Sequence, residues 1–457
     1  MNKIFLIFFI IITIFFGTIT YKIVSDKYDK QNKIIIIFKG LVPEKLKNSL
    51  RTTVYEIRSF LNSGEEENLI KIKQEQGLRG KLIKNEIFTS KEKNEKFRLK
   101  EFFLPFKRLD LTYGWAASDN SKRAHYFEVI GDNIIAISGE GKTIYFEKKN
   151  FENNELNQKI IQNNLNKILK QNNSELIGIR DLYFENNKLF ISMLIKDKNG
   201  YTFNIYEAEK NFKKLTFKLF FKTNEYVADY SIGTGGRIEK FSKDRLLLTI
   251  GHLGKKNAPQ NKSSLAGKII AINKLNKNYE LISLGHRNPQ GLFYHEEKNL
   301  VINSEHGPKG GDEININHNP SSNIKNFGWP ISSYGEHYYK NYSEKILSEA
   351  PLKKSHKKYG FEEPLKYFDP SIGISQIIPL NEDETEFLVG AMGNEIKDQD
   401  LGIHYIKLDE KRKKVIKSKY ALLNERVRDM IVSLDKKTII IFLETSSTLA
   451  VLKKQNI

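Results

Sequence analysis

Short runs of alternating apolar and polar residues fill the chain after residue 120, and turns rich in Asn, Asp, Gly and Lys separate them. Alternation with a period of two is typical of β-strands that bury one face. One unit recurs: an alternating strand, a polar turn of a few residues, and then a more apolar strand. It starts near residues 127, 181, 237, 291, 376 and 429. The pattern therefore predicts six copies of one β-structured repeat.

The spacing of these repeats predicts a closed ring. The units recur about every 54 residues, close to the period of the blades of β-propellers. A single four-stranded blade cannot bury both of its faces, whereas blades packed side by side in a ring can. We therefore predict an all-β, six-bladed β-propeller over residues 116–457; a β-sandwich is the alternative, and the even spacing disfavours it. The longer interval from 291 to 376 contains an insertion of about 30 residues, the kind of segment that often carries function.

The N-terminus has a different pattern. Residues Ile4–Thr20 carry no charge, whereas Lys3 precedes them and Lys22 and Asp26 follow. The run is at the short end for a membrane-spanning helix and also fits the apolar part of a signal peptide. Because no clear cleavage site follows, we predict a transmembrane signal-anchor in residues 1–24, a single-pass protein of the cell membrane and a propeller in the periplasm. Cleavage and secretion to the periplasm is the alternative.

Residues 25–115 are mixed and charged. Apolar residues at helical spacing predict a helix over Pro43–Leu61, and Phe102–Trp115 has the pattern of one or two strands. No chemical motif occurs in this stretch. We interpret it as a spacer or a small N-terminal region between the anchor and the propeller.

Composition narrows the possible functions. Cysteine is absent, which excludes disulfides, thiolate metal sites, cysteine nucleophiles and covalently attached haem. The formal net charge is +19, from 74 Lys and Arg against 55 Asp and Glu. The lysines are scattered rather than gathered with aromatics on one element, so we interpret them as a solvated surface and expect no nucleic-acid partner.

The fourth interval holds the densest cluster of Gly, Pro, His, acidic and aromatic residues. Its motifs are Gly285–Gly291 (GHRNPQG), Ser304–Glu313 (SEHGPKGGDE), Asn326–Pro330 (NFGWP) and Tyr334–Tyr338 (YGEHY). The HExxH arrangement of helical zinc sites is absent. The glycines leave backbone carbonyls accessible, and Asp312 and Glu313 add carboxylates. These are the ligands of a hard cation such as calcium.

Three arginines stand out in a chain whose basic residues are mostly lysine. Arg287 suits an anionic ligand at the same place as the motifs, since a guanidinium binds a carboxylate through two hydrogen bonds. Arg426 and Arg428 are two residues apart, so on a strand both point to one face and favour an anion there. The alternative is a pair of surface ion pairs with Glu425 and Asp429.

In this order, the motifs HRNPQG, EHGPKGGDE, NFGWP and SYGEHY resemble the quinoprotein sugar dehydrogenases of the soluble glucose dehydrogenase and aldose sugar dehydrogenase type. The stretches Pro370–Ser375, Phe387–Ala391 and Glu425–Asp429 agree with this, and the resemblance covers roughly residues 120–453. It implies a six-bladed propeller, in agreement with the repeats. It further implies binding of pyrroloquinoline quinone (PQQ) beside calcium, and oxidation of the C1 hydroxyl of aldoses with hydride transfer to the quinone.

The resemblance assigns roles by motif. The implied cofactor-binding residues are Arg287, Asn288, Gln290, Tyr338, Arg426 and Arg428. The carbonyls of Gly307 and Pro308 are implied as calcium ligands, and Glu313 matches a further calcium position of some members. There this chain has Phe327 where the family usually has Tyr.

Two departures from the family concern the chemistry. The family's catalytic base is a His four residues before an Arg, and the matching stretch here is GTGGR, with Gly233 at the base position. Relatives pair that base with an Asp after the next strand, where this chain has His252. We hypothesise that His252 supplies the imidazole from across the site; the alternative is a loop histidine without a role. The early Gln that touches the cofactor is also missing, because Leu176–Ile179 stands in its place.

Two hypotheses follow. In the first, the protein is an exported, membrane-tethered PQQ-dependent sugar dehydrogenase with a relocated base. In the second, the propeller has lost turnover and acts as a ligand-binding or interaction module. A dehydrogenase of this kind takes a sugar as its substrate, and because the chain has no haem site it needs a separate electron acceptor.

Overall fold

The computed structural model describes residues 81–84, 89–90, 95–103, 124–149, 158–228, 233–338, 342–393, 398–433, 438–445 and 448–456. The expected signal-anchor in residues 1–24 and the expected helix over Pro43–Leu61 lie outside these residues. Among the helices that are described, none is long and apolar enough to cross a membrane.

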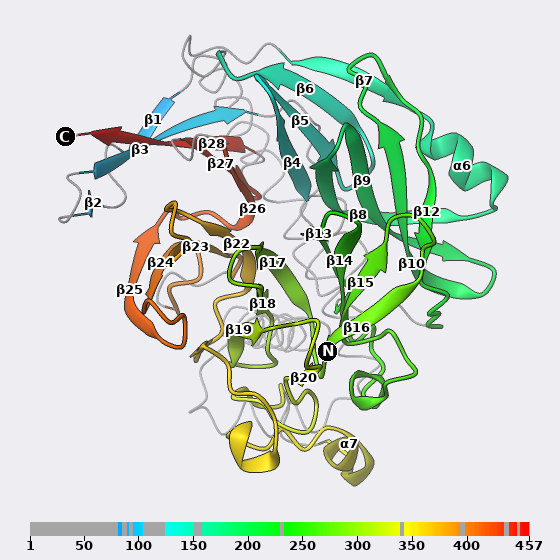
Figure 1. Cartoon of the computed structure of the whole chain (residues 1–457), viewed down its shortest axis with the longest axis vertical. Helices are drawn as coiled ribbons and strands as arrows, with labels where there is room; N and C mark the ends of the chain where they lie inside the picture. Colours follow the sequence, from blue (N-terminus) through cyan, green and yellow to red (C-terminus); the bar gives the residue numbers. More distant parts are fainter. Residues whose placement is uncertain are drawn as a thin grey trace, which may run out of the picture. The chain divides into compact units, whose positions relative to one another are not determined.

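Six β-sheets make up the described chain, and each contributes one strand to the middle of a ring (Figure 1). The first three sheets contain β4 (His125–Ile130), β5 (Asn133–Ser138), β6 (Thr143–Glu147) and β7 (Lys159–Asn163); β8 (Glu175–Glu185), β9 (Lys188–Asp197), β10 (Gly200–Glu209) and β12 (Lys218–Lys222); and β13 (Gly235–Ser242), β14 (Arg245–Ile250), β15 (Lys268–Asn273) and β16 (Tyr279–Leu284).

The last three sheets contain β17 (Pro289–His295), β18 (Leu300–Glu305), β19 (Asp312–His318) and β21 (Lys366–Phe368); β22 (Ile374–Pro379), β23 (Glu386–Ala391), β24 (Gly402–Leu408) and β25 (Val415–Leu422); and β26 (Val427–Val432), β27 (Thr438–Leu443), β28 (Thr448–Asn456) and β3 (Glu95–Phe103). Short edge strands are β1 (Lys81–Lys84) and β2 (Thr89–Ser90) beside β3, β11 (Lys214–Leu215) beside β7, and β20 (Lys325–Asn326) beside β16. The helices are α6 (Leu165–Gln171), α7 (Glu344–Glu349), and the short 3₁₀ turns η1 (Ala258–Gln260) and η2 (Lys357–Tyr359).

The first strands of the six sheets contact one another in succession and close a circle: β4, β8, β13, β17, β22, β26 and back to β4. Each of the six repeat starts expected from the sequence falls in one of these strands. The prediction of an all-β, six-bladed β-propeller is therefore confirmed. The repeats form blades because their apolar second strands are fully buried between neighbours; in the sixth blade, Ile439–Leu443 is almost entirely excluded from water.

The sixth blade is completed by a strand from near the start of the described chain. β3 pairs antiparallel with β28 from Phe103↔Thr448 to Asn456↔Glu95, and Figure 1 shows β3 in blue beside β28 in red. The sequence predicts a spacer over residues 25–115 that lies outside the ring. The structure differs from this prediction at β1, β2 and β3, because these strands belong to the sheet of the sixth blade.

A single arginine lies at the centre of the ring. Arg237 of β13 is only 3% exposed, and its guanidinium forms ion pairs with Asp181 at 2.9 Å and Asp429 at 2.7 Å. It also donates to the carbonyls of Gln290 at 2.7 Å and Arg428 at 3.2 Å. The four partners lie on or beside β8, β26 and β17, so one side chain joins four blades.

The predicted insertion is present in the fourth blade, between β19 and β21. It contains β20, α7 and η2, and β20 pairs in parallel with β16 of the third blade. The insertion therefore contacts the third blade, through β16, as well as its own fourth blade.

Candidate functional site

The predicted site residues gather at one end of the ring, where the first strands begin and the second strands end. We call this end the upper rim. Three β-hairpins contribute to it, and in each the strand register continues past the last paired residues. These continued registers place Gly233 opposite His252, Asn288 opposite His306, and Arg426 opposite Glu444. Backbone hydrogen bonds confirm the last two pairs, from His306 N to Asn288 O (3.1 Å) and from Glu444 N to Arg426 O (2.7 Å).

Arg287 connects the third and fourth blades at this rim. Its guanidinium donates to the carbonyl of His306 at 3.0 Å and lies over the ring of Trp329, 5.4 Å from the centroid. Its backbone N–H donates to the carboxylate of Glu305 at 2.7 Å, and its carbonyl accepts from the backbone N–H of His252 at 2.8 Å. Arg287 is thus fixed at its main chain, while its side chain faces the mouth of the site.

The imidazole of His252 lies directly against Gly233. A Cβ atom added to Gly233 would stand 2.2 Å from both Cε1 and Nδ1 of the ring, so a side chain at this position requires the imidazole of His252 to move. Nδ1 lies 3.0 Å from the carbonyl of Arg287, and because a carbonyl only accepts, Nδ1 carries the proton. The ring therefore occupies the space into which a side chain at position 233 would project.

Burial and the neighbouring charge of Arg287 lower the pKa of His252 to about 3. Two backbone hydrogen bonds, to the carbonyls of Arg287 and Gly233, act in the opposite direction and are outweighed. No carboxylate is among the groups that shift this pKa, in contrast to the Asp partner that the family resemblance implies for the usual base. His252 is consequently neutral at physiological pH.

His306 lies near enough to three arginines for their charges to act on its imidazole. Burial first, and then the charges of Arg287, Arg428 and Arg426, lower the pKa of its imidazole to about 3. Within the described residues, its ring makes no hydrogen bond, and it lines a small internal cavity with Arg287 and Trp329. Of the three arginines only Arg287 lines this cavity, together with Glu305 and Glu313, whereas Arg426 and Arg428 act on His306 through their charge.

Arg426 and Arg428 share one carboxylate. Nε of Arg426 donates to Glu444 at 3.1 Å, and Nε of Arg428 donates to the other oxygen of the same group. Arg426 also donates to the backbone carbonyls of Met392 and Gly393. The alternative of ion pairs with Glu425 and Asp429 is not what these contacts show: the shared partner is Glu444, and Asp429 pairs with Arg237. Among the contacts of the described residues, these two guanidiniums therefore share one acid.

Asn288 and Gln290 contact each other at the start of β17. The amide of Gln290 donates to the side-chain oxygen of Asn288 at 2.9 Å, and the same oxygen accepts from the backbone N–H of Gly235 at 3.1 Å. Both residues are thus fixed between the third and fourth blades, beside Arg287.

The turn that contains Gly307 and Pro308 follows β18. The buried carboxylate of Asp312 accepts from the backbone N–H of Gly307 at 2.9 Å and from two further N–H groups of the loop before β22. The carbonyl of Pro308 accepts from the hydroxyl of Ser371 at 3.1 Å. No hydrogen bond to the carbonyl of Gly307 occurs in the described part of the chain. Two carbonyls on a turn held by an acid are suitable donors for calcium, so the predicted pair fits that ion.

Glu313 has a different environment from the one expected of a metal ligand. It is buried on β19, where one oxygen lies 3.0 Å from Nε2 of His356 and the other lies 3.4 Å from the amide of Asn315. Phe327, which stands where the family usually has Tyr, has no ligand atom in its side chain and packs on the ring of His286, with centroids 5.0 Å apart. Among the described residues no group of three or more His, Asp or Glu side chains could hold a metal. A further cation at Glu313 is therefore poorly matched by the residues around it.

Tyr338 lies in the insertion and is 41% exposed. Leu176–Ile179, in place of the family's early Gln, lies in β8.

Sequence reasoning missed four residues of the rim: Glu305, His306, Trp329 and Glu444. Three of them lie in motifs already singled out, and the hairpin register that follows β27 could have identified Glu444 as the partner of Arg426.

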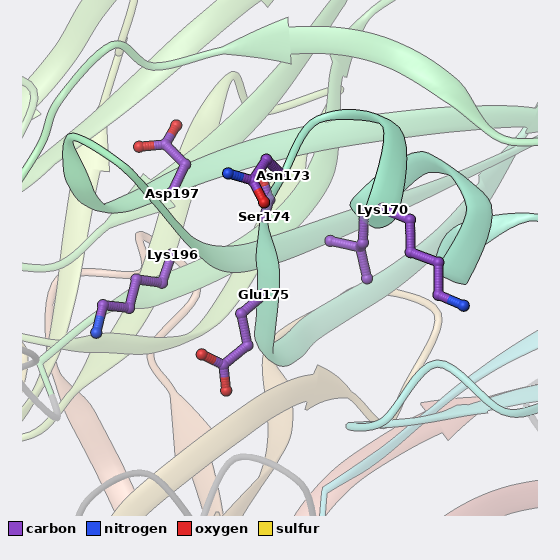
Figure 2. A pocket seen from close by; sticks show the side chains of 7 residues that line it. Lys170, Asn173, Ser174, Glu175, Lys196 and Asp197 are labelled. Carbon is purple, nitrogen blue, oxygen red and sulfur yellow. The ribbon is translucent and has the colours of Figure 1, made fainter.

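A separate hollow lies on the second blade, between α6 and the β8–β9 pair. It is lined by Leu169, Lys170, Asn173, Ser174, Glu175, Lys196 and Asp197. Figure 2 shows that the charged side chains point away from one another rather than toward a common centre. Two cations and two anions that do not converge give no site for a charged ligand.

Residues 150–451 match the family model described as glucose/sorbosone dehydrogenase. The aldose sugar dehydrogenase YliI of Escherichia coli strain K12 is 31% identical over 185 residues, which are 36% of this chain and 46% of that protein. An uncharacterised protein of Synechocystis sp. is 28% identical over 221 residues, 43% of this chain and 50% of its own length. The chain spans about half the length of the curated relatives it matches.

Solved structures share the fold. A glucose dehydrogenase has a TM-score of 0.57 at 19% identity, covering 73% of this chain and 96% of its own. The apo form of the soluble aldose sugar dehydrogenase of E. coli has a TM-score of 0.55 at 18% identity, covering 73% and 95%. The PQQ-bound aldose sugar dehydrogenase of Streptomyces coelicolor has a TM-score of 0.52 at 16% identity, covering 79% and 99%. The likeness in fold agrees with the family match, which extends over about two thirds of the chain, and the protein belongs to the glucose/sorbosone dehydrogenase family.

Proposed function

We propose that this protein is an aldose sugar dehydrogenase that uses PQQ with calcium and passes electrons to a separate acceptor. The observation that carries the proposal is the placement of Arg287, Arg426 and Arg428 at one rim, where Arg426 and Arg428 share the carboxylate of Glu444 among the described residues. A tricarboxylate such as PQQ is the kind of ligand that such a rim accepts. A solved relative of the same fold is described as PQQ-bound.

Each group at the rim has a role in this proposal. Arg426 and Arg428 hold the carboxylates of the quinone, while Arg287, Asn288 and Gln290 line it from the fourth blade. Tyr338 adds a cofactor contact. The carbonyls of Gly307 and Pro308 hold calcium. When bound, the quinone supplies a two-electron acceptor for hydride, and the cation supplies a Lewis acid beside it.

His252 takes the role of the base that Gly233 cannot supply. Its ring lies within the space of a side chain at 233, and Nδ1–H is anchored on the Arg287 carbonyl, which fixes the ring's orientation. The neutral imidazole accepts the proton of the sugar hydroxyl as hydride leaves. A pKa of about 3 describes a weak base, but an anion that offsets the charge of Arg287 removes one of the two causes of that low pKa.

A second function, a ligand-binding module without turnover, is favoured by two observations. The amide that the family places near the cofactor is absent from Leu176–Ile179, and His252 follows β14, whereas the usual base position, Gly233, precedes β13. If the imidazole is misdirected, the rim still binds an anion but oxidises nothing.

The deciding experiment is a titration of the purified protein with PQQ and calcium, followed by the absorbance of the quinone, and then addition of a panel of aldoses. The expected result is calcium-dependent binding and bleaching of the quinone by at least one sugar. Binding without bleaching supports the non-catalytic module, and no binding contradicts the dehydrogenase and any module whose ligand is PQQ.

A residue exchange tests the relocated base. His252→Gln is expected to keep PQQ affinity and lose turnover about 100- to 10,000-fold, the usual contribution of a general base. The double variant Gly233→His/His252→Asp restores the arrangement that the family resemblance implies, and it is expected to recover activity. The single change Gly233→His is the matched control, because the added side chain collides with His252. Full activity in His252→Gln contradicts the role.

We also propose that residues 1–24 tether the protein to the cell membrane and place the propeller in the periplasm. The charge-free run Ile4–Thr20 supports this. Fractionation of cells that express the full chain and a chain without residues 1–24 tests it. We expect the full chain in the membrane fraction and accessible to periplasmic protease, and full-length protein in the cytosol contradicts the proposal.

A further inference from the structure

Glu305 is a buried carboxylate that binds residues of the upper rim and the residues packed beneath them. It ends β18 and is 3% exposed. One oxygen lies 2.9 Å from Nδ1 of His286 and 2.7 Å from the amide of Asn315. The other oxygen accepts from the backbone N–H of Arg287 at 2.7 Å, and the backbone N–H of Asn288 also donates to the carboxylate. Four donors therefore match the four acceptor sites of one carboxylate.

The peptide groups on either side of Arg287 link this carboxylate to His252. The backbone N–H of Arg287 binds Glu305, while its carbonyl lies 2.8 Å from the backbone N of His252 and 3.0 Å from Nδ1 of its ring. Because the Arg287 carbonyl fixes the imidazole and Glu305 fixes Arg287, a displacement of Glu305 moves the ring. No other carboxylate accepts from Arg287 in the described chain.

The carboxylate is itself held from behind. His286 lies between Glu305 and the hydroxyl of Ser283, which is 2.7 Å from its Nε2, and the whole group is excluded from water. The Ser283–His286–Glu305 order has the geometry of a hydrolytic triad, but Ser283 is 1% exposed and no substrate can reach it. Ser283 and His286 therefore serve to hold Glu305 in place, because buried polar groups in a complete hydrogen-bond network keep fixed positions.

We propose that Glu305 is a positioning residue for His252, acting through the main chain of Arg287. This inference rests on the proposed function, since it concerns the proposed base. In the family, a carboxylate contacts the base directly. In this chain the carboxylate of Glu305 binds the backbone N–H of Arg287, and the carbonyl of Arg287 contacts the imidazole. The base then keeps its orientation without a negative charge beside it.

A measurement that needs no quinone tests the geometry. The full-length protein is labelled with ¹⁵N-histidine, and the ring signals of His252 are identified by their loss in His252→Gln. In the wild type we expect a neutral ring with its proton on Nδ1 and slow exchange of that proton with water. In Glu305→Gln, an amide with one oxygen cannot satisfy four donors, so we expect a shifted Nδ1 signal and at least tenfold faster exchange. An unchanged signal in the folded variant overturns the proposal.

Turnover supplies a second readout. With saturating PQQ, Glu305→Gln is expected to lower kcat about 10- to 100-fold, as small misplacements of catalytic groups do. In the background Gly233→His/His252→Asp, where position 252 no longer carries the base, the same change is expected to cost less than about threefold. A merely structural role would lower kcat equally in both backgrounds, and that outcome also overturns the proposal.

Controls separate the remaining outcomes. Asp181→Asn removes another buried carboxylate, one that binds the backbone N–H of Ile238 at 2.7 Å and the guanidinium of Arg237. Since no contact in the described chain joins Asp181 to Arg287 or His252, a folded Asp181→Asn should leave the ring signal unchanged. If Glu305→Gln does not fold, His286→Gln loosens the carboxylate from behind and is expected to shift the same signal by a smaller amount. Failure of PQQ to bind while the signal responds contradicts the proposed function and leaves the positioning role intact.

Discussion

Two clusters of arginine and acid lie close together in this propeller and differ in their bonding: Arg237 with Asp181 and Asp429 on the axis, and Arg426 and Arg428 with Glu444 at the rim. On the axis, Arg237 is fully buried, and its donors are occupied by Asp181, Asp429 and two backbone carbonyls. At the rim, Arg426 and Arg428 share the single carboxylate of Glu444, and Arg426 is partly exposed. The axis has more acid than base, and the rim has more base than acid.

The difference separates a structural charge from a functional one. A buried guanidinium that has all of its partners holds blades together, and nothing remains for a ligand to satisfy. Guanidiniums with one shared acid keep donors and net charge for an anion that arrives later. Burial alone does not distinguish the two clusters, because Arg428 is only 8% exposed; the number of carboxylates for each guanidinium does.

The largest expected effect is on the axis. Arg237→Met leaves Asp181 and Asp429 buried without their cation, so we expect the free energy of unfolding to fall by about 3 to 5 kcal/mol. Urea unfolding followed by tryptophan fluorescence measures it. If the variant does not fold, Arg237→Lys keeps the charge with fewer donors and is expected to lose a smaller amount. A loss below about 1 kcal/mol for Arg237→Met would contradict the structural role.

The second effect reverses the pattern. Arg426→Met is expected to weaken PQQ binding about 10- to 100-fold, the contribution of a hydrogen bond to a charged group. It should change the free energy of unfolding by less than about 1 kcal/mol, because the side chain is partly exposed and Glu444 retains Arg428. Absorbance titration and urea unfolding measure the two quantities. Equal quinone affinity in the variant and the wild type would remove the distinction between the clusters.

The third effect concerns pH. Folding lowers the pKa of His252 to about 3, while in the unfolded chain it stays near 6.5. Between these values the unfolded state binds the additional proton, so acid lowers stability from about pH 6.5 downward. His252→Gln lacks this titrating group and should therefore lose less stability than the wild type between pH 7 and pH 5. Because His252 is half-buried and solvent screens part of the effect, we expect a difference of about 1 kcal/mol. Parallel stability curves for the two proteins would show that the ring is not held neutral.

The smallest effect is expected in the hollow of Figure 2. Lys196→Gln and Glu175→Gln change charges that do not converge, so unfolding free energy should move by less than about 0.5 kcal/mol and PQQ affinity should not move. The same two assays measure both. A clear loss of quinone binding would mean that the anion site extends to the second blade.

The propeller was predictable because each blade is a local object. The six repeat starts are visible as alternation followed by a turn and an apolar strand, and hairpin partners are close in sequence. The closing strand was not predictable, because β3 pairs with a strand about 350 residues later and nothing near Glu95–Phe103 encodes that partner.

The site was predictable in its motifs and less so in its partners. Arg287, Asn288, Gly307 and the arginine pair came from the family resemblance, and the structure brings them to one rim. Glu444 was missed because its role depends on strand register, which continues past β27 to the position opposite Arg426. Glu313 followed a motif, but its neighbours His356 and Asn315 occupy its oxygens, and neither is marked by the motif.

The β3–β28 pair gives the ring a fixed order of assembly. The first five blades use strands that follow one another, so they can form while the chain is still being made. The sixth cannot, because β3 has to wait for residues 448–456. At about 5 to 20 residues per second, the ribosome needs roughly 20 to 70 s to cover the distance between the two strands. For that time the sixth blade is incomplete, and the nine residues of β28 complete it when they pair with β3.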